Sequence, residues 1–341
     1  MSKLKDDRRP PYTITEKSAD YLAKIVETVT RLEFGTAFKR NIKLHRENRV
    51  RTIHSSLAIE GNSLTLNEVT AVIAGKVVAG KQTDVKEVKN AYEAYDKIMT
   101  FNPYRIADFL NAHKLMTQGL VEEAGKFRSG DVGVFDGDVA VHIGARPQFV
   151  PQLMEDLLSW AKTSELHPVL KSAILHYEIE TIHPFADGNG RMGRLWQTLL
   201  LAKWNVIFAW IPMETVLYRN RPQYYKAIED ARKANDSGVF IEFTLSALYE
   251  ILQNTNSDLL ATEQVTEQDN EQVGREERIL AFCAQAKTRA EIQTFVGISH
   301  REHFRIKILK PLLESGKLKM TIPDKPNSRN QKYVTNTDLS F

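Results

Sequence analysis

The sequence has 341 residues, of which 42% are hydrophobic and 26% are charged, and its formal net charge is only +3. This composition is typical of a soluble globular protein and excludes a disordered or fibrous chain. No run of 18 apolar residues is present, so we expect no membrane-spanning helix and no membrane partner. The length predicts two or three domains.

The cellular compartment is indicated by two further features. The first 17 residues contain no apolar core, so they do not form a secretory signal. Cys283 is the only cysteine, which excludes an intramolecular disulfide and is typical of a reducing compartment. We therefore expect a cytoplasmic protein.

Helical periodicity dominates the chain. Apolar residues recur at three- and four-residue intervals in segments 19–34, 84–99, 149–164 and 169–182. Segment 132–143 instead alternates apolar with small or polar residues around an Asp-Gly pair, which predicts a β-hairpin. Residues 254–273 are polar, with few large apolar side chains, and we expect a linker there. The fold class is therefore mainly α.

A first motif lies in the stretch SSLAIEGNSLTLNE near the N-terminus. Ser56 and Glu60 stand four residues apart on a helix that Gly61 is expected to end. Thr65 and Glu68 form a capping box that starts the next helix. Taken alone, Glu60 would be an ordinary surface acid.

A second motif, HPFADGNGRMGR at residues 183–194, lies between two helical patterns. The preceding helix should end before His183, because Pro184 disfavours helical geometry there. Residues 188–190 then form a glycine-rich turn at the N-terminus of a new helix. At such a place, unpaired backbone N–H groups and the helix dipole attract phosphate.

Other side chains of the same motif suit phosphate chemistry. Arg191 and Arg194 project from one face of the first helical turn and can fork onto phosphate oxygens. Asp187 supplies a hard oxygen ligand for Mg²⁺, and His183 can accept a proton near neutral pH. A glycine turn alone is usually a helix cap and an arginine pair alone a solvated face, but their combination favours a functional site. The Walker lysine and the HExxH zinc motif are absent from the sequence.

The second motif resembles the Fic family signature H-P-F-x-[DE]-G-N-G-R-x-x-R and matches it at every specified position. The resemblance covers roughly residues 45–250 and implies a compact helical core with the hairpin as a flap. It also implies transfer of AMP from ATP to a protein hydroxyl, with release of pyrophosphate. Gly190 stands where phosphate-transferring Doc relatives carry a lysine, which favours a nucleotide that lies along the loop.

The resemblance implies a role for each residue of the loop. His183 would deprotonate a target Ser, Thr or Tyr hydroxyl, Asp187 would hold Mg²⁺ between the α- and β-phosphates, and Phe185 would anchor the loop. Asn189 and its neighbouring amides would fix the α-phosphate, while the two arginines would hold the β- and γ-phosphates. The expected ATP-binding residues of the loop are Gly188, Asn189, Gly190, Arg191, Met192, Gly193 and Arg194. Further on, Asn220 is expected beside the adenine, with Tyr224 a weaker candidate because tyrosines at helical spacing are more often part of the core.

The first motif also resembles a family feature, the inhibitory motif [ST]-x-x-x-E-[GN], which Ser56, Glu60 and Gly61 satisfy. In such proteins the glutamate pairs with the last arginine of the signature, here Arg194, and blocks productive placement of the γ-phosphate. In some relatives the same glutamate promotes removal of AMP, and the sequence leaves that alternative open.

The C-terminal segment 274–341 has a different pattern. Three helical stretches and two strand-like stretches predict a winged helix-turn-helix with Gly297 in its turn. The segment carries 13 Lys and Arg against 7 Asp and Glu, a net charge of +6, whereas the rest of the chain carries −3. This concentration of charge suits DNA, but such modules also dock proteins, and both partners stay open.

Together these patterns predict the domain organisation and the function. We expect an N-terminal helical region 1–105 with the inhibitory motif at 56–61, a Fic core 106–253, the linker 254–273 and the winged domain 274–341. The expected function is a protein adenylyltransferase that binds its target as a strand at 132–143, with a homodimer left open. The alternatives are a DNA-binding regulator with a nucleotide-sensing core, a de-AMPylating enzyme, or a Fic enzyme that transfers another nucleotidyl or phosphodiester group.

Overall fold

The computed structural model describes residues 9–34, 42–136, 139–298, 300–326 and 328–336. The chain divides into two compact units, Met1–Leu259 and Leu260–Phe341. Each unit is described by itself. No helix in the described part of the chain is both long and apolar enough to cross a membrane.

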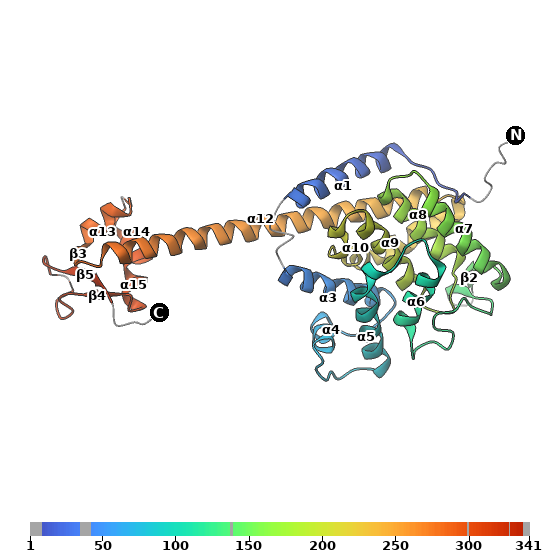
Figure 1. Cartoon of the computed structure of the whole chain (residues 1–341), viewed down its shortest axis with the longest axis horizontal. Helices are drawn as coiled ribbons and strands as arrows, with labels where there is room; N and C mark the ends of the chain where they lie inside the picture. Colours follow the sequence, from blue (N-terminus) through green and yellow to red (C-terminus); the bar gives the residue numbers. More distant parts are fainter. Residues whose placement is uncertain (1–8, 35–41, 137–138, 299, 327, 337–341) are drawn as a thin grey trace. The chain divides into compact units, whose positions relative to one another are not determined.

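The first unit is helical, as the sequence predicts, with one hairpin (Figure 1). Its helices are α1 (Glu16–Phe34), α3 (Ile42–Ile59), α4 (Leu66–Ile73), α5 (Gln82–Asp96), α6 (Ile106–Thr117), α7 (Val150–Thr163), α8 (Pro168–Ile182), α9 (Asn189–Trp204), α10 (Met213–Arg219), α11 (Arg221–Ala234) and the start of α12 (Gly238–Phe282). Short 3-10 turns lie at Ile98–Thr100, Pro147–Phe149 and Val206–Ala209. The expected capping box is present at the start of α4, where Thr65 accepts from the N–H of Glu68.

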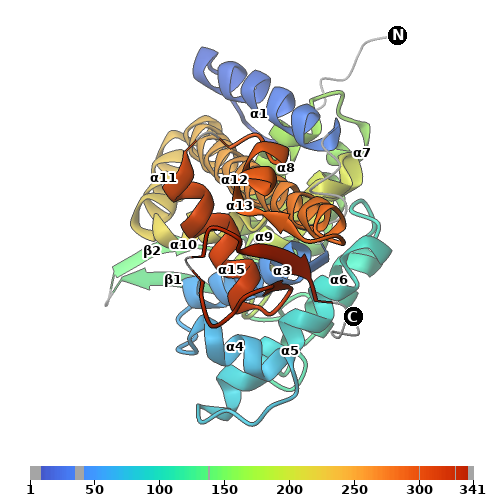
Figure 2. The same ribbon diagram turned by 90° about the vertical axis from the view of Figure 1, so that its left-hand side faces the viewer.

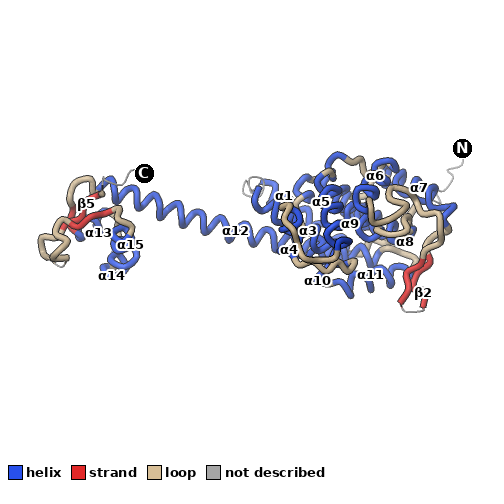
Figure 3. Tube along the Cα trace, turned by 90° about the horizontal axis from the view of Figure 1, so that it is seen from below, coloured by secondary structure: helices blue, strands red, loops and turns tan. Residues whose placement is uncertain are grey.

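The hairpin consists of β1 (Gly133–Asp136) and β2 (Val139–Ile143), which pair antiparallel. Its register shifts between Val134 and Phe135. Figure 3 shows the hairpin projecting from the helices of this unit. The expected strand pair at 132–143 is therefore present.

Helices α8 and α9 form the centre of the first unit. Their apolar side chains contribute to two separate clusters of buried residues, one shared with α1, α10, α11 and α12 and the other with α3 to α7. Figure 2 accordingly shows α1 and the pair α4 and α5 on opposite sides of α9. Because α8 and α9 pack on both sides, the turn that joins them is held rigidly at its two ends.

The second unit contains the end of α12, α13 (Arg289–Phe295), α14 (Arg301–Phe304), a π-helical turn (Arg305–Leu309), α15 (Lys310–Glu314) and three strands. The strands β3 (Lys287–Thr288), β4 (Leu318–Met320) and β5 (Lys332–Thr335) form an antiparallel sheet in the order β3-β5-β4. The sequence predicts only two strands, because β3 has two residues and no visible alternation. Gly297 lies between α13 and α14 with φ +71°, as a turn there requires.

The region that we expected to be a linker is helical in the structure. Residues 254–273 are helical and lie inside α12. Polarity suggested a linker, but this stretch contains no Pro or Gly, and Glu, Gln and Ala are compatible with a helix. The first of the three helical stretches expected in segment 274–341 is the last part of α12, which ends at Phe282.

Candidate active site

The turn between α8 and α9 begins at His183, which caps α8. This residue adopts the left-handed conformation, φ 53° and ψ 62°, and its N–H donates to the Ile179 carbonyl at 2.9 Å. Its Nδ1 lies 3.3 Å from the Glu180 carbonyl oxygen. A carbonyl oxygen only accepts, so Nδ1 carries the proton and the neutral ring has its lone pair on Nε2. The geometry thus gives His183 the tautomer of a general base.

Arg128 holds this turn in place, and sequence reasoning missed it. Its side chain is 3% exposed, and its guanidinium donates to the carbonyls of His183 at 2.7 Å, of Gly130 at 2.8 Å and of Ala145. Its backbone N–H donates to the Pro184 carbonyl at 3.1 Å. One arginine therefore ties both ends of the hairpin segment to the turn. Arg128 is the arginine of an ordinary Phe-Arg-Ser stretch, and no sequence pattern there predicts this role.

Phe185 is fully buried, as the expected anchor of the loop. Its ring stacks on His113 with 3.6 Å between centroids and on Phe109 with 5.2 Å. His113 Nδ1 accepts from the Gly125 N–H at 3.0 Å, so Nε2 donates to the Asp187 carbonyl at 3.0 Å. Burial lowers the pKa of His113 to about 4, so this second histidine is neutral and holds the loop.

The Asn189 side chain bonds the backbone of the loop, and its expected contact with the α-phosphate stays a prediction. Its Oδ1 accepts from the Phe185 N–H at 2.8 Å, and its Nδ2 donates to the Phe185 carbonyl at 2.9 Å. The amide is buried and closes the loop on itself. What remains for a phosphate is the backbone of the first turn of α9, whose N–H groups have no intrahelical acceptor. Gly188 precedes this turn with φ +86°, a conformation that glycine adopts without strain.

Arg191 is buried and is paired with two carboxylates. Its side chain is only 3% exposed and pairs with Glu87 of α5 at 3.1 Å and with Asp187 at 2.8 Å. Two carboxylates thus occupy the guanidinium that the sequence assigns to a phosphate. The expected contact between Arg191 and ATP remains a prediction that requires these pairs to open.

Arg194 and the inhibitory motif meet as the sequence predicts. The side chain of Arg194 is fully buried and its Nη2 lies 2.7 Å from Glu60 Oε1. Its Nε donates to Ser56 Oγ at 3.0 Å, and Nη2 also donates to the Ser56 carbonyl at 3.0 Å. Burial alone would lower the pKa of Arg194, but the charges of Glu60, Tyr224 and Glu180 outweigh burial and raise the pKa. The motif therefore binds Nε and Nη2 of the guanidinium, whereas Nη1 is buried without a hydrogen-bond partner.

The remaining loop residues pack against their surroundings. A Cβ at Gly190 would clash with Glu60 Oε1, so the backbone here lies directly against the inhibitory carboxylate. A Cβ at Gly193 would lie 2.6 Å from Cδ2 of His176 in α8. Met192 is fully buried in the core. Of these three residues, only Gly190 borders the place where a phosphate would replace the carboxylate.

A buried acid, Glu180, lies on the other side of Arg194. Burial raises its pKa to about 7, and the nearby charge of Glu60 adds to this effect. Its carboxylate accepts from the Tyr224 hydroxyl at 3.3 Å, and that hydroxyl also lies 3.0 Å from His176 Nε2. Burial lowers the pKa of His176 to about 3, so the ring is neutral. Tyr224 is therefore a core residue.

The chain that follows Glu60 is also anchored to the site. Asn62 Nδ2 donates to Glu87 Oε2 at 2.7 Å, and Glu87 in turn holds Arg191. The Tyr225 hydroxyl donates to the Ile59 carbonyl at 3.3 Å. Glu87 therefore connects the inhibitory segment with the loop, and no sequence pattern pointed to it.

Asn220 lies at the junction of α10 and α11, half-buried. Its Nδ2 donates to the Val216 carbonyl at 3.1 Å, so its amide has a local partner. Its expected contact with adenine stays a prediction.

Asp187 is the residue of the loop that could hold Mg²⁺. In the part of the chain that the structure describes, no three His, Cys, Asp or Glu side chains are grouped to hold a metal. Asp187 is 61% exposed and adjoins the N-terminus of α9. One exposed carboxylate fits an ion whose other ligands are substrate phosphates and water.

These features describe a helical protein in which a histidine, the N-terminus of a buried helix and an arginine paired with a glutamate belong to one loop. The Fic/DOC family profile matches residues 103–201, and the profile described as "Filamentation induced by cAMP protein Fic-like, C-terminal domain" matches residues 271–335. A solved Fic family protein from Desulfovibrio desulfuricans G20 is 39% identical, with a TM-score of 0.72 over 98% of this chain and 100% of its own. The chain belongs to the Fic family.

Several curated relatives are named protein adenylyltransferases. That of Caenorhabditis briggsae is 28% identical over 215 residues, which are 59% of this chain and 39% of the relative. That of Nematostella vectensis is 31% identical over 216 residues, 60% of this chain and 47% of the relative. The chain thus spans less than half the length of these relatives.

Proposed function

We propose that this protein transfers AMP from ATP to a hydroxyl side chain of a protein, itself included. The observation that carries the proposal is the position of His183, which lies in the short turn before the N-terminus of α9 with its Nδ1 3.3 Å from the Glu180 carbonyl oxygen, so that Nε2 of the neutral ring can accept a proton. The names of the curated relatives support the same activity.

In the proposed reaction, the target hydroxyl oxygen attacks the α-phosphorus of ATP. His183 Nε2 takes the hydroxyl proton, the bond from the α-phosphorus to its bridging oxygen breaks, and pyrophosphate leaves. The N–H groups at the start of α9 hold phosphate oxygens. Asp187 would hold Mg²⁺, which neutralises charge on the phosphates.

The hairpin supports binding of the target as a strand. Within the described residues β1 and β2 pair only with each other, so each has an edge that can accept an extended segment. Gly144, which follows β2, lies against the turn, since a Cβ there would be 3.4 Å from His183 Cβ. A strand added at this edge would deliver its side chains near the base.

The contact between Glu60 and Arg194 supports self-inhibition. A carboxylate and a γ-phosphate would compete for one buried guanidinium, which Ser56 further orients. Couplings of this kind are typically about 1–3 kcal/mol. The proposed enzyme is therefore held at low activity by Glu60.

The test uses ATP labelled in its α-phosphate, Mg²⁺ and the full chain. We expect weak labelling of the natural sequence and stronger labelling of Glu60→Gly. Adding His183→Ala to that variant should reduce transfer by about 10²–10⁴-fold while ATP still binds. Label in the γ-phosphate should not be retained. Undiminished transfer without His183, or retention of the γ label, would overturn the proposal.

For the C-terminal unit we propose binding to duplex DNA, as a winged helix-turn-helix would. The support is the net charge of +6 on residues 274–341 and a set of exposed basic side chains, Arg289, Arg301, Lys307, Lys325 and Arg329. Fluorescence anisotropy of a labelled duplex with the full chain should show affinity that falls steeply between 50 and 200 mM salt, about 10³-fold or more if six phosphates are contacted. Absence of binding at low salt would leave protein docking as the role of this unit.

A further inference from the structure

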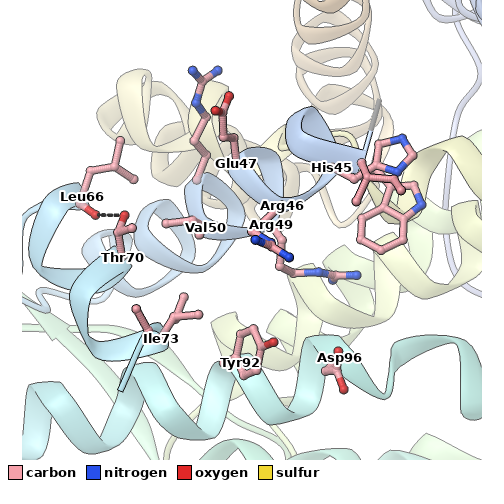
Figure 4. A pocket seen from close by; sticks show the side chains of 14 residues that line it. His45, Arg46, Glu47, Arg49, Val50, Leu66, Thr70, Ile73, Tyr92 and Asp96 are labelled. Carbon is pink, nitrogen blue, oxygen red and sulfur yellow. Dashed lines mark hydrogen bonds between the residues drawn. The ribbon is translucent and has the colours of Figure 1, made fainter. Parts of the chain in front are cut away.

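An open cavity of about 1050 Å³ is lined by residues of α3, α4 and α5 and by Trp210. None of its lining residues belongs to the loop 183–194. Val50 and Ile73 form part of an apolar wall, and Tyr92 stands opposite them on α5 (Figure 4). The volume is at the upper end of the range of small-molecule sites.

Three arginines of α3 line this cavity: Arg46, Arg49 and Arg51. Figure 4 shows Arg46 and Arg49 reaching into the open space toward α5, where Asp96 and Tyr92 stand. Glu47, the other acid of the lining, lies 3.9 Å from Lys43. Positive charge therefore exceeds negative charge within the cavity.

Arg49 is the informative member because it is buried, with 9% exposure. Its guanidinium lies over the rings of Trp210 at 4.8 Å and Tyr95 at 5.6 Å. No residue that the structure describes forms an ion pair or a hydrogen bond with its side chain. The nearby buried acid Glu214 accepts instead from the Tyr95 hydroxyl at 2.9 Å.

A cation in this position is unusual on energetic grounds. Buried charges are normally paired, because leaving water costs several kcal/mol per ion. Contact with aromatic faces recovers only part of that cost, and desolvation lowers the pKa of Arg49. An anion that entered the cavity would supply the missing partner.

We propose that this cavity binds a small organic anion, with a phosphate or carboxylate group between Arg46 and Arg49 and an apolar body against Val50, Ile73 and Tyr92. Its hydroxyl or amino groups, where present, would meet Asp96. The cavity would then be a second ligand site, separate from that for ATP.

The position of the cavity on α3 couples it to the inhibitory motif. Ser56 and Glu60 follow Arg49 by seven and eleven residues, so on a helix all three point within about 20° of one direction. Glu60 directly follows the last residue of α3. An anion bound in the cavity favours the arrangement of α3, α4 and α5 seen here, in which Glu60 holds Arg194. The bound anion should therefore strengthen inhibition, a step that rests on the proposed function.

Binding is tested by calorimetric titration of phenyl phosphate into the full chain. We expect saturable binding that Arg46→Gln and Arg49→Gln each weaken about tenfold or more, because each removes a charge-assisted hydrogen bond. Lys162→Gln, which removes an exposed charge from α7, a helix that contributes no residue to the cavity, is the control and should change nothing. Arg194→Ala should not abolish binding and should weaken it only by the coupling factor of about fivefold, because the coupling between the cavity and the Glu60–Arg194 pair is reciprocal.

Three results would overturn the site: no saturable binding, binding unaffected by both cavity variants, or binding lost in Arg194→Ala. Arg46 is exposed, so its variant keeps the test valid even if Arg49→Gln fails to fold. Benzoate in place of phenyl phosphate distinguishes a carboxylate from a phosphate ligand. Phenol, which has the ring without the charge, should not bind.

Coupling is tested separately with α-labelled ATP. Saturating phenyl phosphate should lower transfer by the natural sequence about fivefold or more and leave Glu60→Gly unaffected. Equal inhibition of both would mean competition at the ATP site and would overturn the coupling. Transfer absent from every variant would contradict the proposed function, while the calorimetric result would still decide the cavity.

Discussion

The two halves of the loop 183–194 are held by different kinds of contact. The first half is held by contacts that a phosphate could not replace. Arg128 binds backbone carbonyls, the neutral His113 binds the backbone of Asp187, and Asn189 bonds the backbone of Phe185. The second half is held by carboxylates on its two arginines. A phosphate can replace a carboxylate but not a backbone carbonyl. The first half is therefore suited to fixed geometry and the second to exchange with a ligand.

The strongest test of the fixed half is Arg128→Met. The change leaves the carbonyls of His183, Gly130 and Ala145 without this donor, so the turn should lose its orientation. We expect the maximal rate of AMP transfer, measured in a Glu60→Gly background, to fall about 10²-fold, the typical result of a misplaced reacting group. The Kd for ATP should change little, because the N-terminus of α9 is untouched.

Arg146→Met is the control for that experiment. Arg146 is an exposed arginine just past the same hairpin, so its loss should leave transfer unchanged. If Arg128→Met weakens ATP binding as much as the rate, Arg128 supports the whole site and is not specific to the base.

The exchangeable half is tested by Glu60→Gly. Loss of the carboxylate opens Arg194 to the γ-phosphate, and transfer should rise about 5- to 150-fold, the range of a 1–3 kcal/mol coupling. Labelling of self or target with α-labelled ATP measures the change. Arg194→Ala should not mimic it, because the phosphate clamp disappears together with the inhibitory partner.

The double variant gives the decisive comparison, since it should behave like Arg194→Ala alone. If Glu60→Gly leaves transfer unchanged while His183→Ala abolishes it, the core is catalytic without self-inhibition, and Glu60 is an ordinary surface acid.

The sequence predicts the parts of the site that depend on local patterns. The helix ends around His183 follow from Pro184 and the glycines, and the meeting of Glu60 with Arg194 follows from the family motif. Arg128, His113 and Glu87 could not be found this way, because each acts through contacts with residues far away in the chain. The sequence also could not predict side-chain orientations. No local pattern determines that Asn189 bonds the Phe185 backbone or that Arg191 pairs with Glu87 and Asp187.

Fold prediction had the same limit. Helical periodicity located α1, α5 and α7, whose buried residues recur along one face, and it also located α8, which is buried on nearly all sides. The sequence of residues 254–273 has few large apolar residues, and this polar composition suggested a linker although the backbone is helical. Strand β3 has two residues, and only its pairing with β5 makes it a strand.

A third prediction concerns how the free energy of unfolding depends on pH through Glu180, whose charge interacts with Arg194. The folded-state pKa of Glu180 is raised to about 7 by burial and by Glu60. For an acid with a raised pKa, stability is fully present below the unfolded value, about 4.3, and is lost as pH rises through about 7. Glu180→Gln removes this loss, so the variant should be more stable by about 3 kcal/mol at pH 8 and by only about 1 kcal/mol at pH 5.

Thermal unfolding at both pH values measures this difference. Glu178, whose pKa burial also raises to about 7, adds a similar slope to both proteins and cancels in the comparison. An equal difference at pH 5 and pH 8 would show that packing, not ionisation, distinguishes the variant.

The smallest effect is expected at Arg191, where two carboxylates share one guanidinium. Glu87→Gln keeps an oxygen for Asn62 but removes one charge from Arg191. If Arg191 exchanges its partners for phosphate, ATP should bind about two- to fivefold more tightly, as loss of a partly exposed competing ion pair of about 1 kcal/mol implies. Glu93→Gln, on the same helix and paired with Lys97 at 2.8 Å, is the matched control. Weaker ATP binding in Glu87→Gln would contradict this prediction. Arg191 would then be a structural residue that needs its pair with Glu87, and Arg194 alone would exchange a carboxylate for a phosphate.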